Sequence, residues 1–473
     1  MFATGVRQFR LAMSMVWGRR IDPRNVERLI RDAQRTLKEF GAPGDDVQQL
    51  LEGPFADPQA RREFQDGALR RTARRLERVS PYYRQRFQAA GTRPADMTVE
   101  SITSVPVTRK RDLVERQRDL LAAGSSPHLT TRTTGTTGKP VEIWLSRYET
   151  ELWPAVSALS GLLRDEIRPS DCMQVNVSSR ATAAVHENVQ VCRLAGARSR
   201  VLGIVPPAES LDSLLDGSEL APTLLTTYPS YLALLLRAAR ERGLGPDDFQ
   251  LRRIDCGGEV LSSALARAAR ETFGAPVNDV FGMTEVMPVS GRVCAGGHLH
   301  HDLNIGYVEV LDLDTAEPVR PGELGTVVIT PYYPYRECMP VFRYDTRDVV
   351  RRLPETPMSC ELAGTPATSR ILGKAEQLVR WDGRVVTTRD LVEVIEALPS
   401  EPWPARFAAR ADGDKLRLEL SEQALEGLGA GEVERRFAAA GLPALAGNGQ
   451  PDAAALRPLR ADLIETTFAG RRQ

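Results

Sequence analysis

Apolar and polar positions follow two different periods in the middle of the chain. From about residue 150 to 290, short apolar runs are separated by longer segments in which apolar residues recur at helical spacing. Strands that alternate with helices in this way predict βαβ units and a largely parallel sheet, covered by helices on both faces. The predicted strands are 175–177, 200–204, 223–226 and 253–256, and the predicted helices are 149–163, 228–242 and 262–273.

The region before this alternation is helical in pattern. Apolar residues at helical spacing predict helices at 26–40 and 46–52, separated by a break at Gly41-Ala42-Pro43-Gly44. Residues 67–90 have the pattern of one further amphipathic helix that is rich in arginine. We therefore interpret residues 1–65 as a helical extension.

The pattern changes again after residue 300. Strand-like runs at 306–311 and 325–330 flank a turn with proline and glycine, which predicts an antiparallel pair. A proline-rich loop at 354–366 leads to a compact tail. The elements predicted in the tail are a short segment at 376–379, a helix at 390–397, strands near 406–409 and 415–420, and a helix at 431–440.

These patterns indicate two structural parts. The length of 473 residues is enough to bury a large core and to form more than one domain. We place a boundary at 371–374, between a large part at 1–370 with mixed sheets and packed helices and a small α+β part at 374–473. The fold class expected from the sequence is therefore α/β.

Charge, apolar runs and cysteines narrow the function classes. The chain has 62 basic and 62 acidic residues, which argues against nucleic acid or an anionic membrane as a partner. No apolar run approaches the roughly 20 residues of a membrane span, and the first twenty residues lack a cleavage-site pattern. Six scattered cysteines do not form a disulfide framework. We expect a cytoplasmic protein.

One segment combines small hydrogen-bond donors with a lysine. Hydroxyl groups and glycine amides can surround an anion closely, and a lysine adds a mobile positive charge, so a polyphosphate is the natural ligand. The spacing differs from that of a P-loop, because Pro140 stands where the metal-binding Ser or Thr would be. A threonine-rich turn is the alternative. The segment reads Thr130-Thr131-Arg132-Thr133-Thr134-Gly135-Thr136-Thr137-Gly138-Lys139-Pro140.

Further motifs follow this loop in a fixed order. They are Gly257-Gly258-Glu259, Phe281-Gly282-Met283-Thr284-Glu285 and Arg343-Tyr344-Asp345-Thr346-Arg347-Asp348. Together with the loop they resemble the adenylate-forming (ANL) superfamily. Its phenylacetate-CoA ligase and capsular-biosynthesis (CapK-like) branch is similar also at Ser80–Phe87, Val105–Leu113 and Thr227–Tyr231. The resemblance covers about residues 68–395.

The resemblance implies a fold and an activity. The fold would be a large nucleotide- and acid-binding part with a small mobile C-terminal lid. The activity would be ATP-dependent activation of a carboxylic acid, in this branch an aromatic one, to an acyl-AMP. The acyl group would pass to CoA, a carrier protein or an amine, and a homodimer is possible. Trp153, Tyr228, Tyr231 and Phe281 are candidates for an aromatic pocket, although such residues are commonly part of a core.

The resemblance also assigns roles to residues. Gly258 and Glu259 would line the adenine, Phe281 would stack near it, and Asp348 would bind the ribose hydroxyls. Catalysis would involve Thr284 at the α-phosphate and Glu285 as a ligand of Mg²⁺, which prefers carboxylate and phosphate oxygens. The β- and γ-phosphates would be held by Thr133, Thr134, Gly135, Thr136, Thr137, Gly138 and the catalytic Lys139.

Some members of the branch hold a structural zinc, and here the ligand set is incomplete. Cys294, His300 and Cys360 match three positions, but the expected CxC pair reads Met358-Ser359-Cys360. The fourth ligand would be an added water molecule or another residue, such as Cys338 or His301. The alternative is an ordinary loop that has lost its metal.

The expected C-terminal lysine of the branch is also missing. In these ligases it offsets the repulsion between the acid and ATP. The hinge segment is Gly373-Lys374-Ala375-Glu376, and the end of the chain contains no lysine. Three alternatives follow: an arginine such as Arg471 substitutes, adenylation is slow, or the chemistry has changed. The competing function is therefore an adenylation-impaired homologue, acting as an acyl transferase or as a binding or scaffold protein in a biosynthetic pathway.

Overall fold

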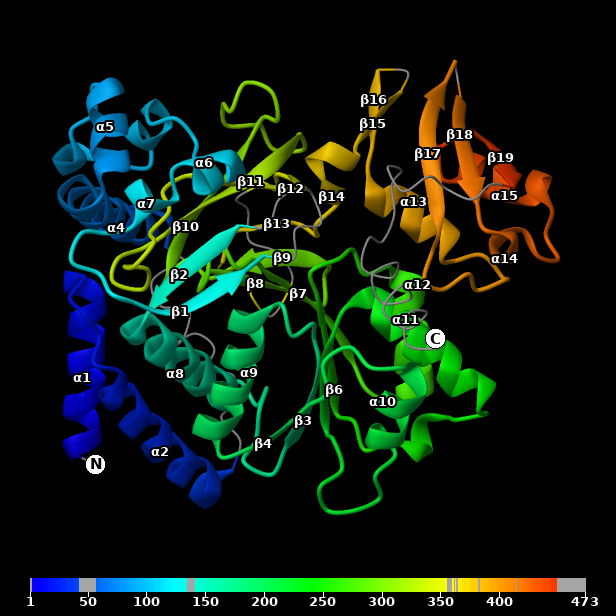
Figure 1. Cartoon of the computed structure of the whole chain (residues 1–473), viewed down its shortest axis with the longest axis horizontal. Coiled ribbons are helices and arrows are strands. Elements are labelled where there is room, and N and C mark those ends of the chain that lie inside the picture. Colours follow the sequence, from blue (N-terminus) through cyan, green and yellow to red (C-terminus); the bar gives the residue numbers. More distant parts are fainter. Residues whose placement is uncertain are drawn as a thin grey trace.

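The core of the protein is an eight-stranded sheet with helices on both faces (Figure 1). The computed structural model describes residues 2–41, 57–133, 141–354, 360, 362, 365–381, 383–413 and 415–448. Five neighbouring strands of the sheet are parallel, as the alternating pattern predicts. In the order of the sheet, the strands are β13 (Ala367–Ser369), β9 (His298–His301), β8 (Ser290–Val293), β7 (Val277–Gly282), β6 (Arg253–Gly257), β5 (Leu224–Thr227), β3 (Cys172–Asn176) and β4 (Arg198–Val201).

The helices of this region cover opposite faces of the sheet. Two of them pack together on one face and three on the other (Figure 1). The helix predictions at 149–163, 228–242 and 262–273 are confirmed to within two residues at each end. The first face carries α8 (Arg147–Leu163) and α9 (Thr182–Ala195), and the second carries α10 (Pro207–Leu214), α11 (Pro229–Glu241) and α12 (Ser263–Phe273).

The N-terminal region is helical, with one difference from the prediction. The helix predicted at 67–90 is two helices, because Ser80 ends the first and its side chain caps the second, which begins at Pro81. Proline lacks the N–H that a continuous helix needs. The predicted helix at 46–52 lies outside the described residues. The elements here are α1 (Phe2–Trp17), α2 (Pro23–Phe40), α4 (Pro58–Val79), α5 (Pro81–Ala89), α6 (Lys110–Glu115) and α7 (Gln117–Leu120).

Two further sheets belong to the same part of the molecule. A hairpin leads into α8, and a four-stranded antiparallel sheet carries the segments predicted at 306–311 and 325–330. The hairpin strands are β1 (Pro127–Arg132) and β2 (Glu142–Ser146). The antiparallel sheet consists of β10 (Gly306–Leu311), β11 (Leu324–Pro331), β12 (Tyr344–Arg351) and β14 (Gly373–Lys374).

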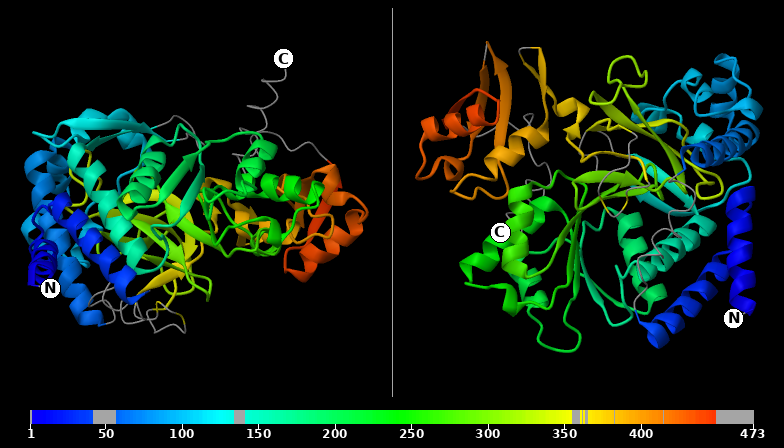
Figure 2. Two further views of the ribbon diagram at one scale, coloured as in Figure 1. Left: turned by 90° about the horizontal axis from the view of Figure 1, so that it is seen from below. Right: turned by 180° about the vertical axis from the view of Figure 1, so that it is seen from behind.

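The C-terminal elements have their own hydrophobic core, formed by residues between Val386 and Ala444. Figures 1 and 2 place these elements at one end of the molecule, opposite α1 and α2. The predicted tail helices and strands are present, and the α/β fold class is confirmed. The elements are β15 (Val379–Trp381), β16 (Arg384–Val386), α13 (Thr388–Ile395), β17 (Phe407–Asp412), β18 (Lys415–Leu420), α14 (Glu422–Leu425), α15 (Ala430–Ala439) and β19 (Ala444–Asn448).

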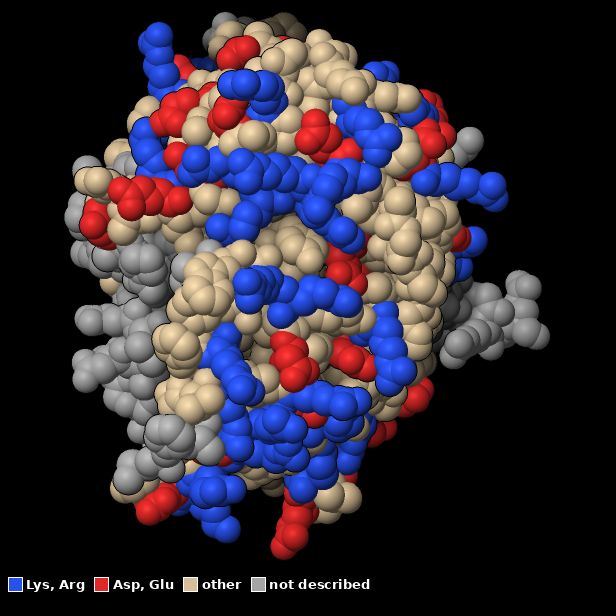
Figure 3. Space-filling model, turned by 90° about the vertical axis from the view of Figure 1, so that its left-hand side faces the viewer, with Lys and Arg blue, Asp and Glu red and all other residues tan. Residues whose placement is uncertain are grey.

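The surface charge is uneven although the net charge is zero. Basic side chains gather on the face to which α1, α2, α4 and α5 contribute (Figure 3). Arg62, Arg74, Arg78 and Arg84 of α4 and α5 are exposed. This face is therefore basic although the chain as a whole has no net charge. Among the described helices, none combines the length and apolar character that crossing a membrane requires.

Candidate active site

Two glycines let the backbone come close to a neighbouring strand at the end of β6. A Cβ added to Gly257 would lie 2.8 Å from the carbonyl oxygen of Val280, and Gly258 has a φ of +82°. Both positions therefore exclude larger residues. Gly257 and Gly258 line a cavity of about 1300 Å³ at the carboxyl ends of the parallel strands. In open α/β sheets this edge is the usual place for a ligand.

The segment after β7 contributes a buried acid to this cavity. Glu285 is 3% exposed and lines the cavity beside Thr284. Burial raises the pKa of Glu285, the nearby Lys374 and Lys110 lower it, and Asp348 raises it further. Glu285 thus lies near another acid, Asp348, and the positive charges of Lys374 and Lys110 act on it. A carboxylate in such a position fits a divalent cation.

Asp348 is the second acid and comes from β12. Its Oδ1 lies 2.9 Å from the Nζ of Lys374, which also donates to the carbonyl oxygen of Thr346 at 3.1 Å. The antiparallel register of β12 and β14 places Asp348 opposite Lys374. Burial raises the pKa of Asp348, and Lys374 counteracts this shift. The lysine of the predicted hinge is therefore the partner of the predicted ribose ligand.

The arginine that opens the Asp348 motif has a structural role. Arg343 is 1% exposed and binds Glu309 with two hydrogen bonds, from Nε to Oε2 at 3.1 Å and from Nη2 to Oε1 at 2.8 Å. It also donates to the carbonyl oxygens of Thr103 and Val105. This bidentate pair fixes the start of the segment that carries Asp348.

Two upstream motifs support the same segment. The Oγ1 of Thr108 donates to the carbonyl oxygen of Phe342 at 2.7 Å, and the backbone N–H of Phe342 donates to the hydroxyl of Tyr83 at 2.8 Å. Thr108 also pairs with the strand at Tyr344. Motifs more than 200 residues apart in the sequence are thus joined by hydrogen bonds. Tyr83 and Thr108 thus contribute to the site indirectly, because they hold the segment that leads into β12.

Glu259 combines a cavity position with a structural contact. Its Oε2 accepts a hydrogen bond from the backbone N–H of Ser230 at 2.9 Å, in the first turn of α11. It satisfies one of the free N–H groups that begin a helix. Glu259 also lines the cavity. The sequence predicted a nucleotide contact and did not predict this cap.

The threonine and glycine loop is described only at its start. The Oγ1 of Thr133 accepts from the backbone N–H of Val141 at 2.9 Å, and Thr133 lines the cavity. The predicted residues Thr134, Gly135, Thr136, Thr137, Gly138 and Lys139 lie outside the described residues, as does Arg471.

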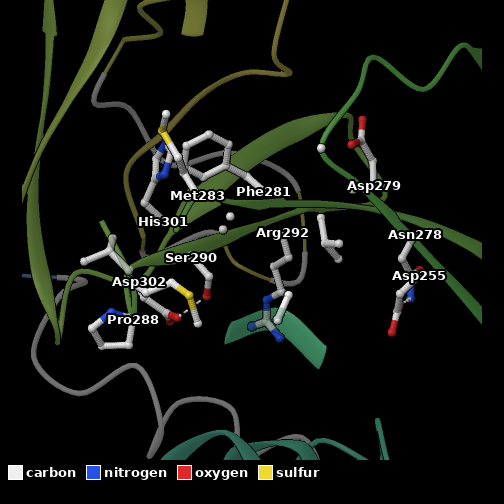
Figure 4. A pocket seen from close by; sticks show the side chains of 18 of the residues that line it. Asp255, Asn278, Asp279, Phe281, Met283, Pro288, Ser290, Arg292, His301 and Asp302 are labelled. Atoms are coloured by element: carbon white, nitrogen blue, oxygen red, sulfur yellow. Dashed lines mark hydrogen bonds between the residues drawn. The ribbon is translucent and has the colours of Figure 1, made fainter. Parts of the chain in front are cut away.

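An aromatic pair lines one side of the cavity (Figure 4). The rings of Phe281 and His301 meet edge to face, with centroids 5.6 Å apart. Burial lowers the pKa of His301 to about 4, so the imidazole is neutral near pH 7. Trp153 and Tyr228 also line the cavity, as predicted. Tyr231 is in the core: it is fully buried, and its hydroxyl donates to the carbonyl oxygen of Val205 at 2.6 Å.

A cluster of two cysteines and two histidines lies beside the cavity. One potential ligand atom from each of Cys294, His298, His300 and Cys360 lies within 4.8 Å of the others. The Sγ of Cys294 is 3.5 Å from the Nδ1 of His298, and the Sγ of Cys360 is 3.6 Å from the Nε2 of His300. Two thiolates and two imidazoles are a set that structural zinc sites use.

His298 is the member that the sequence interpretation missed. Residues two apart in a strand face the same side, so His298 and His300 of β9 reach the cluster while His301 faces the opposite way. Cys338 is fully buried elsewhere. The residue beside the three predicted ligands is therefore His298 and not Cys338 or His301. The spacing Cys294-x₃-His298-x-His300 was the available signal.

Comparisons with known proteins agree with this geometry. A model of the AMP-binding enzyme family matches residues 99–333. The phenylacetate-coenzyme A ligase of Thermus thermophilus is 25% identical over 376 residues, which are 76% of this chain and 82% of that protein. The corresponding ligase of Pseudomonas putida is 27% identical over 349 residues, 71% of this chain and 75% of that protein.

Solved structures share the fold. The structure of 2-hydroxyisobutyryl-CoA ligase in the postadenylation state matches with a TM-score of 0.71 and 20% identity, covering 89% of this chain and 94% of that one. Anthranilate CoA ligase with anthranoyl-AMP matches with a TM-score of 0.52 and 17% identity, covering 73% and 67%.

The chain shares its fold with 2-hydroxyisobutyryl-CoA ligase and anthranilate CoA ligase, and its residues 99–333 match the AMP-binding enzyme family. Its sequence relatives are phenylacetate-coenzyme A ligases.

Proposed function

We propose that this protein couples an aromatic carboxylic acid to CoA in two steps. The observation that supports this most strongly is the meeting of Glu285 and Asp348, which are buried acids from separate segments, at one cavity. The aromatic acid and the CoA acceptor are carried over from the names of the sequence relatives. Phe281, Trp153 and Tyr228 add aromatic surface to the cavity.

In the first step, a carboxylate oxygen of the acid attacks the α-phosphorus of ATP. A phosphorus–oxygen bond forms, the bond to the β-phosphate breaks, and pyrophosphate leaves. The hydroxyl of Thr284 donates a hydrogen bond to the α-phosphate, and Asp348 accepts hydrogen bonds from the ribose after exchanging its contact with Lys374. Glu285 would hold Mg²⁺, which supplies positive charge to the phosphates. The aromatic rings orient the acid in the cavity.

Positive charge is needed where the two anions meet. Lys110 and Lys374 are the lysines of the described chain that line the cavity, and both act on Glu285. We propose that one of them offsets the repulsion that a C-terminal lysine offsets in related ligases. The small part at 374–473 would act as a lid, and its separate core supports this division.

In the second step, CoA loses its thiol proton to solvent and its sulfur attacks the acyl carbon. The bond from this carbon to the AMP oxygen breaks, and the thioester and AMP leave. The acceptor is thereby consumed one for one with the acid.

The test is a pyrophosphate-release assay with ATP, Mg²⁺ and a panel of aromatic acids, followed by addition of CoA. We expect release that depends on the acid, and one AMP and one thioester for each pyrophosphate after CoA is added. If the protein binds ATP but releases pyrophosphate with none of the acids, the result would instead favour the adenylation-impaired homologue. Release without a thioester would assign another acceptor, a carrier protein or an amine.

We also propose that Cys294, His298, His300 and Cys360 bind one structural zinc ion. The donor set supports this, as does the hydrogen-bond contact of His300 Nδ1 with the carbonyl oxygen of Thr365 at 3.0 Å, which orients the other nitrogen. Elemental analysis of the purified protein should give one zinc per chain. Cys294→Ser should lose it, whereas Cys338→Ser, a buried cysteine outside the cluster, should keep it. Equal zinc in both variants would contradict the site.

A further inference from the structure

Two packed helices contribute residues to the lining of the cavity. Successive turns of α8 and α9 contribute them, and the residues of α9 follow the i, i+3, i+4, i+7 spacing of a single helical face. From the α9 side come Ala184, Glu187, Asn188 and Val191, and from the α8 side come Trp153, Val156, Ser157 and Ser160.

One residue of this face is an acid with few partners. The hydroxyl of Ser157 donates to Oε1 of Glu187 at 2.9 Å. Throughout the described chain, Glu187 has no other hydrogen bond from a side chain or the backbone and no ion pair. Burial raises the pKa of Glu187. By contrast, the amide of the adjacent Asn188 donates to the carbonyl oxygen of Ala184 at 2.8 Å and is satisfied within its own helix.

Glu187 and the reacting groups share one cavity. Thr284 and Glu285 line the part where the α-phosphate would bind, and Met287 and Val289, which follow them in the chain, line it as well. The carboxylate of the acid must reach the α-phosphate, and the remainder of the acid would extend along the cavity towards the residues that α8 and α9 contribute. Figure 4 shows that β8 also contributes Ser290 and Arg292 to the lining of the pocket.

Two polar residues of the cavity lining, Arg292 and Ser290, differ from Glu187 because each has a partner within the protein. Arg292 donates to Oε1 of Glu166 at 3.1 Å, and Ser290 donates to Oδ2 of Asp302 at 2.9 Å. A buried carboxyl group costs free energy unless hydrogen-bond donors satisfy it. Ser157 supplies one donor, and Glu187 retains acceptor capacity on the cavity side. A ligand with a donor at its far end would complete the set.

We propose that Glu187, supported by Ser157, selects acids that carry an N–H or O–H donor at the end opposite the carboxylate. Amino- and hydroxy-substituted aromatic acids would be preferred over unsubstituted or methyl-substituted ones. This inference rests on the proposed acid activation and names its substrate class. Glu187 acts as a specificity-determining residue and takes no part in the chemistry of the reacting atoms.

The experiment compares aromatic acids in sets of four. The members of one set carry an amino group, a hydroxyl group, a methyl group or a hydrogen atom at the same ring position, and each ring position has its own set. The kcat/KM for pyrophosphate release is measured for the wild type, Glu187→Gln and Glu187→Leu. Glu241→Gln is the matched control, because Glu241 is an exposed glutamate at the end of α11. Thermal shifts of the same proteins with each acid alone report binding without turnover.

We expect the wild type to prefer the amino or hydroxy acid by about 10²-fold or more at the position that reaches Glu187, because a site built for a donor rejects analogues without one. Glu187→Leu should abolish this preference and use the methyl acid at least as well as the wild type does. Glu187→Gln should keep part of it, since the amide oxygen still accepts. The control should match the wild type.

The outcomes separate the two proposals. If acids support release without any preference for donors, or if Glu187→Leu lowers kcat/KM equally for all four acids, the inference about Glu187 is wrong and acid activation stands. If no acid supports release, acid activation is wrong. Thermal shifts then decide the inference on their own: a donor preference lost in Glu187→Leu supports it, and equal shifts contradict it.

Discussion

Two groups of buried acids in this protein differ in their partners. Glu149 and Glu309 lie in the scaffold, and each faces a buried arginine. Glu149 also accepts hydrogen bonds from the backbone N–H groups of Ser146 at 2.6 Å and Glu337 at 2.9 Å. Burial raises the pKa of both acids, and the arginine counteracts it. The scaffold thus pairs each acid with a donor of fixed geometry.

Two acids of the cavity, Glu285 and Glu187, form no ion pair with an arginine within the described part of the chain. Glu285 has two lysines nearby and an acid as neighbour, and Glu187 has one hydroxyl. Burial raises their pKa values too. The two groups therefore have the same shift and different partners. We infer that the set of partners, more than the pKa shift, distinguishes scaffold from site.

The largest expected effect tests the scaffold. Glu309→Ala leaves the guanidinium of Arg343 buried without its partner, and we expect a loss of about 3–5 kcal/mol in the free energy of unfolding. Urea denaturation measures this loss. Glu151→Ala is the control, because the pair of Glu151 with Arg147 is exposed and should contribute less than about 1 kcal/mol. Equal effects would contradict the assignment of Glu309 to the scaffold.

For Glu285 in the cavity we expect a loss of activity without a loss of stability. Glu285→Ala should lower kcat by about 10²- to 10³-fold, which is the scale for removing a preorganised electrostatic group. Its free energy of unfolding should stay the same or rise, because removing the buried carboxyl group also removes the cost of burying it. Single-turnover kinetics and urea denaturation of one preparation give both numbers. A large loss of stability with normal turnover would place Glu285 in the scaffold.

Glu396 is intermediate between the acids of the scaffold and those of the cavity. It lines the cavity near the C-terminal elements, and its Oε1 accepts a hydrogen bond from the backbone N–H of Ala405, whereas its Oε2 has no hydrogen-bond partner among the described residues. Burial raises its pKa from 4.5 to about 7. The folded state holds the proton more tightly, so the stabilisation is present below pH 4.5 and is lost as the pH rises through 7.

Glu396→Gln should remove this dependence. Above pH 7 we expect the variant to be more stable than the wild type by on the order of 3 kcal/mol, and below pH 4.5 the two should agree. Denaturation at a series of pH values measures the difference. Parallel curves for the two proteins would show that Glu396 does not titrate in this range.

The smallest effect concerns the ribose. Asp348→Asn should raise the KM for ATP about tenfold, because one strong acceptor is lost. Since burial raises the pKa of Asp348, the wild-type KM for ATP should rise as the pH falls, when the protonated group loses acceptor capacity. The variant should lack this rise. A wild-type KM that is constant with pH would argue against the ribose contact.

Local patterns explain which elements could be predicted. The helices α8, α11 and α12 and the strands β5 and β6 lie where the sequence pattern predicted them, because burial on both faces of a sheet gives apolar runs and burial on one face of a helix gives a 3.6-residue period. The predictions for β3 and β4 overlap these strands only in part, and β7, α9 and α10 were not predicted. The error at 67–90 also had a local signal, since Pro81 cannot continue a helix. The missed His298 had a signal in the two-residue period of β9.

Pairing across the chain could not be predicted in the same way. No sequence period indicates that Lys374 lies opposite Asp348, that Glu259 caps α11, or that Arg343 binds Glu309. Each pairing depends on the register of strands or the packing of distant segments. The same holds for Ser157 and Glu187, which meet because α8 and α9 pack face to face.

The sequence by itself determined the types of elements, their order and the residues that carry the adenylate-forming motifs, because these depend on neighbours within a few turns or strands. The tertiary structure decided which charged groups are satisfied and which face the cavity. Hydrogen bonds and ion pairs act over a few ångströms, and only the folded chain brings residues such as Glu285, Asp348 and Lys374 within that range.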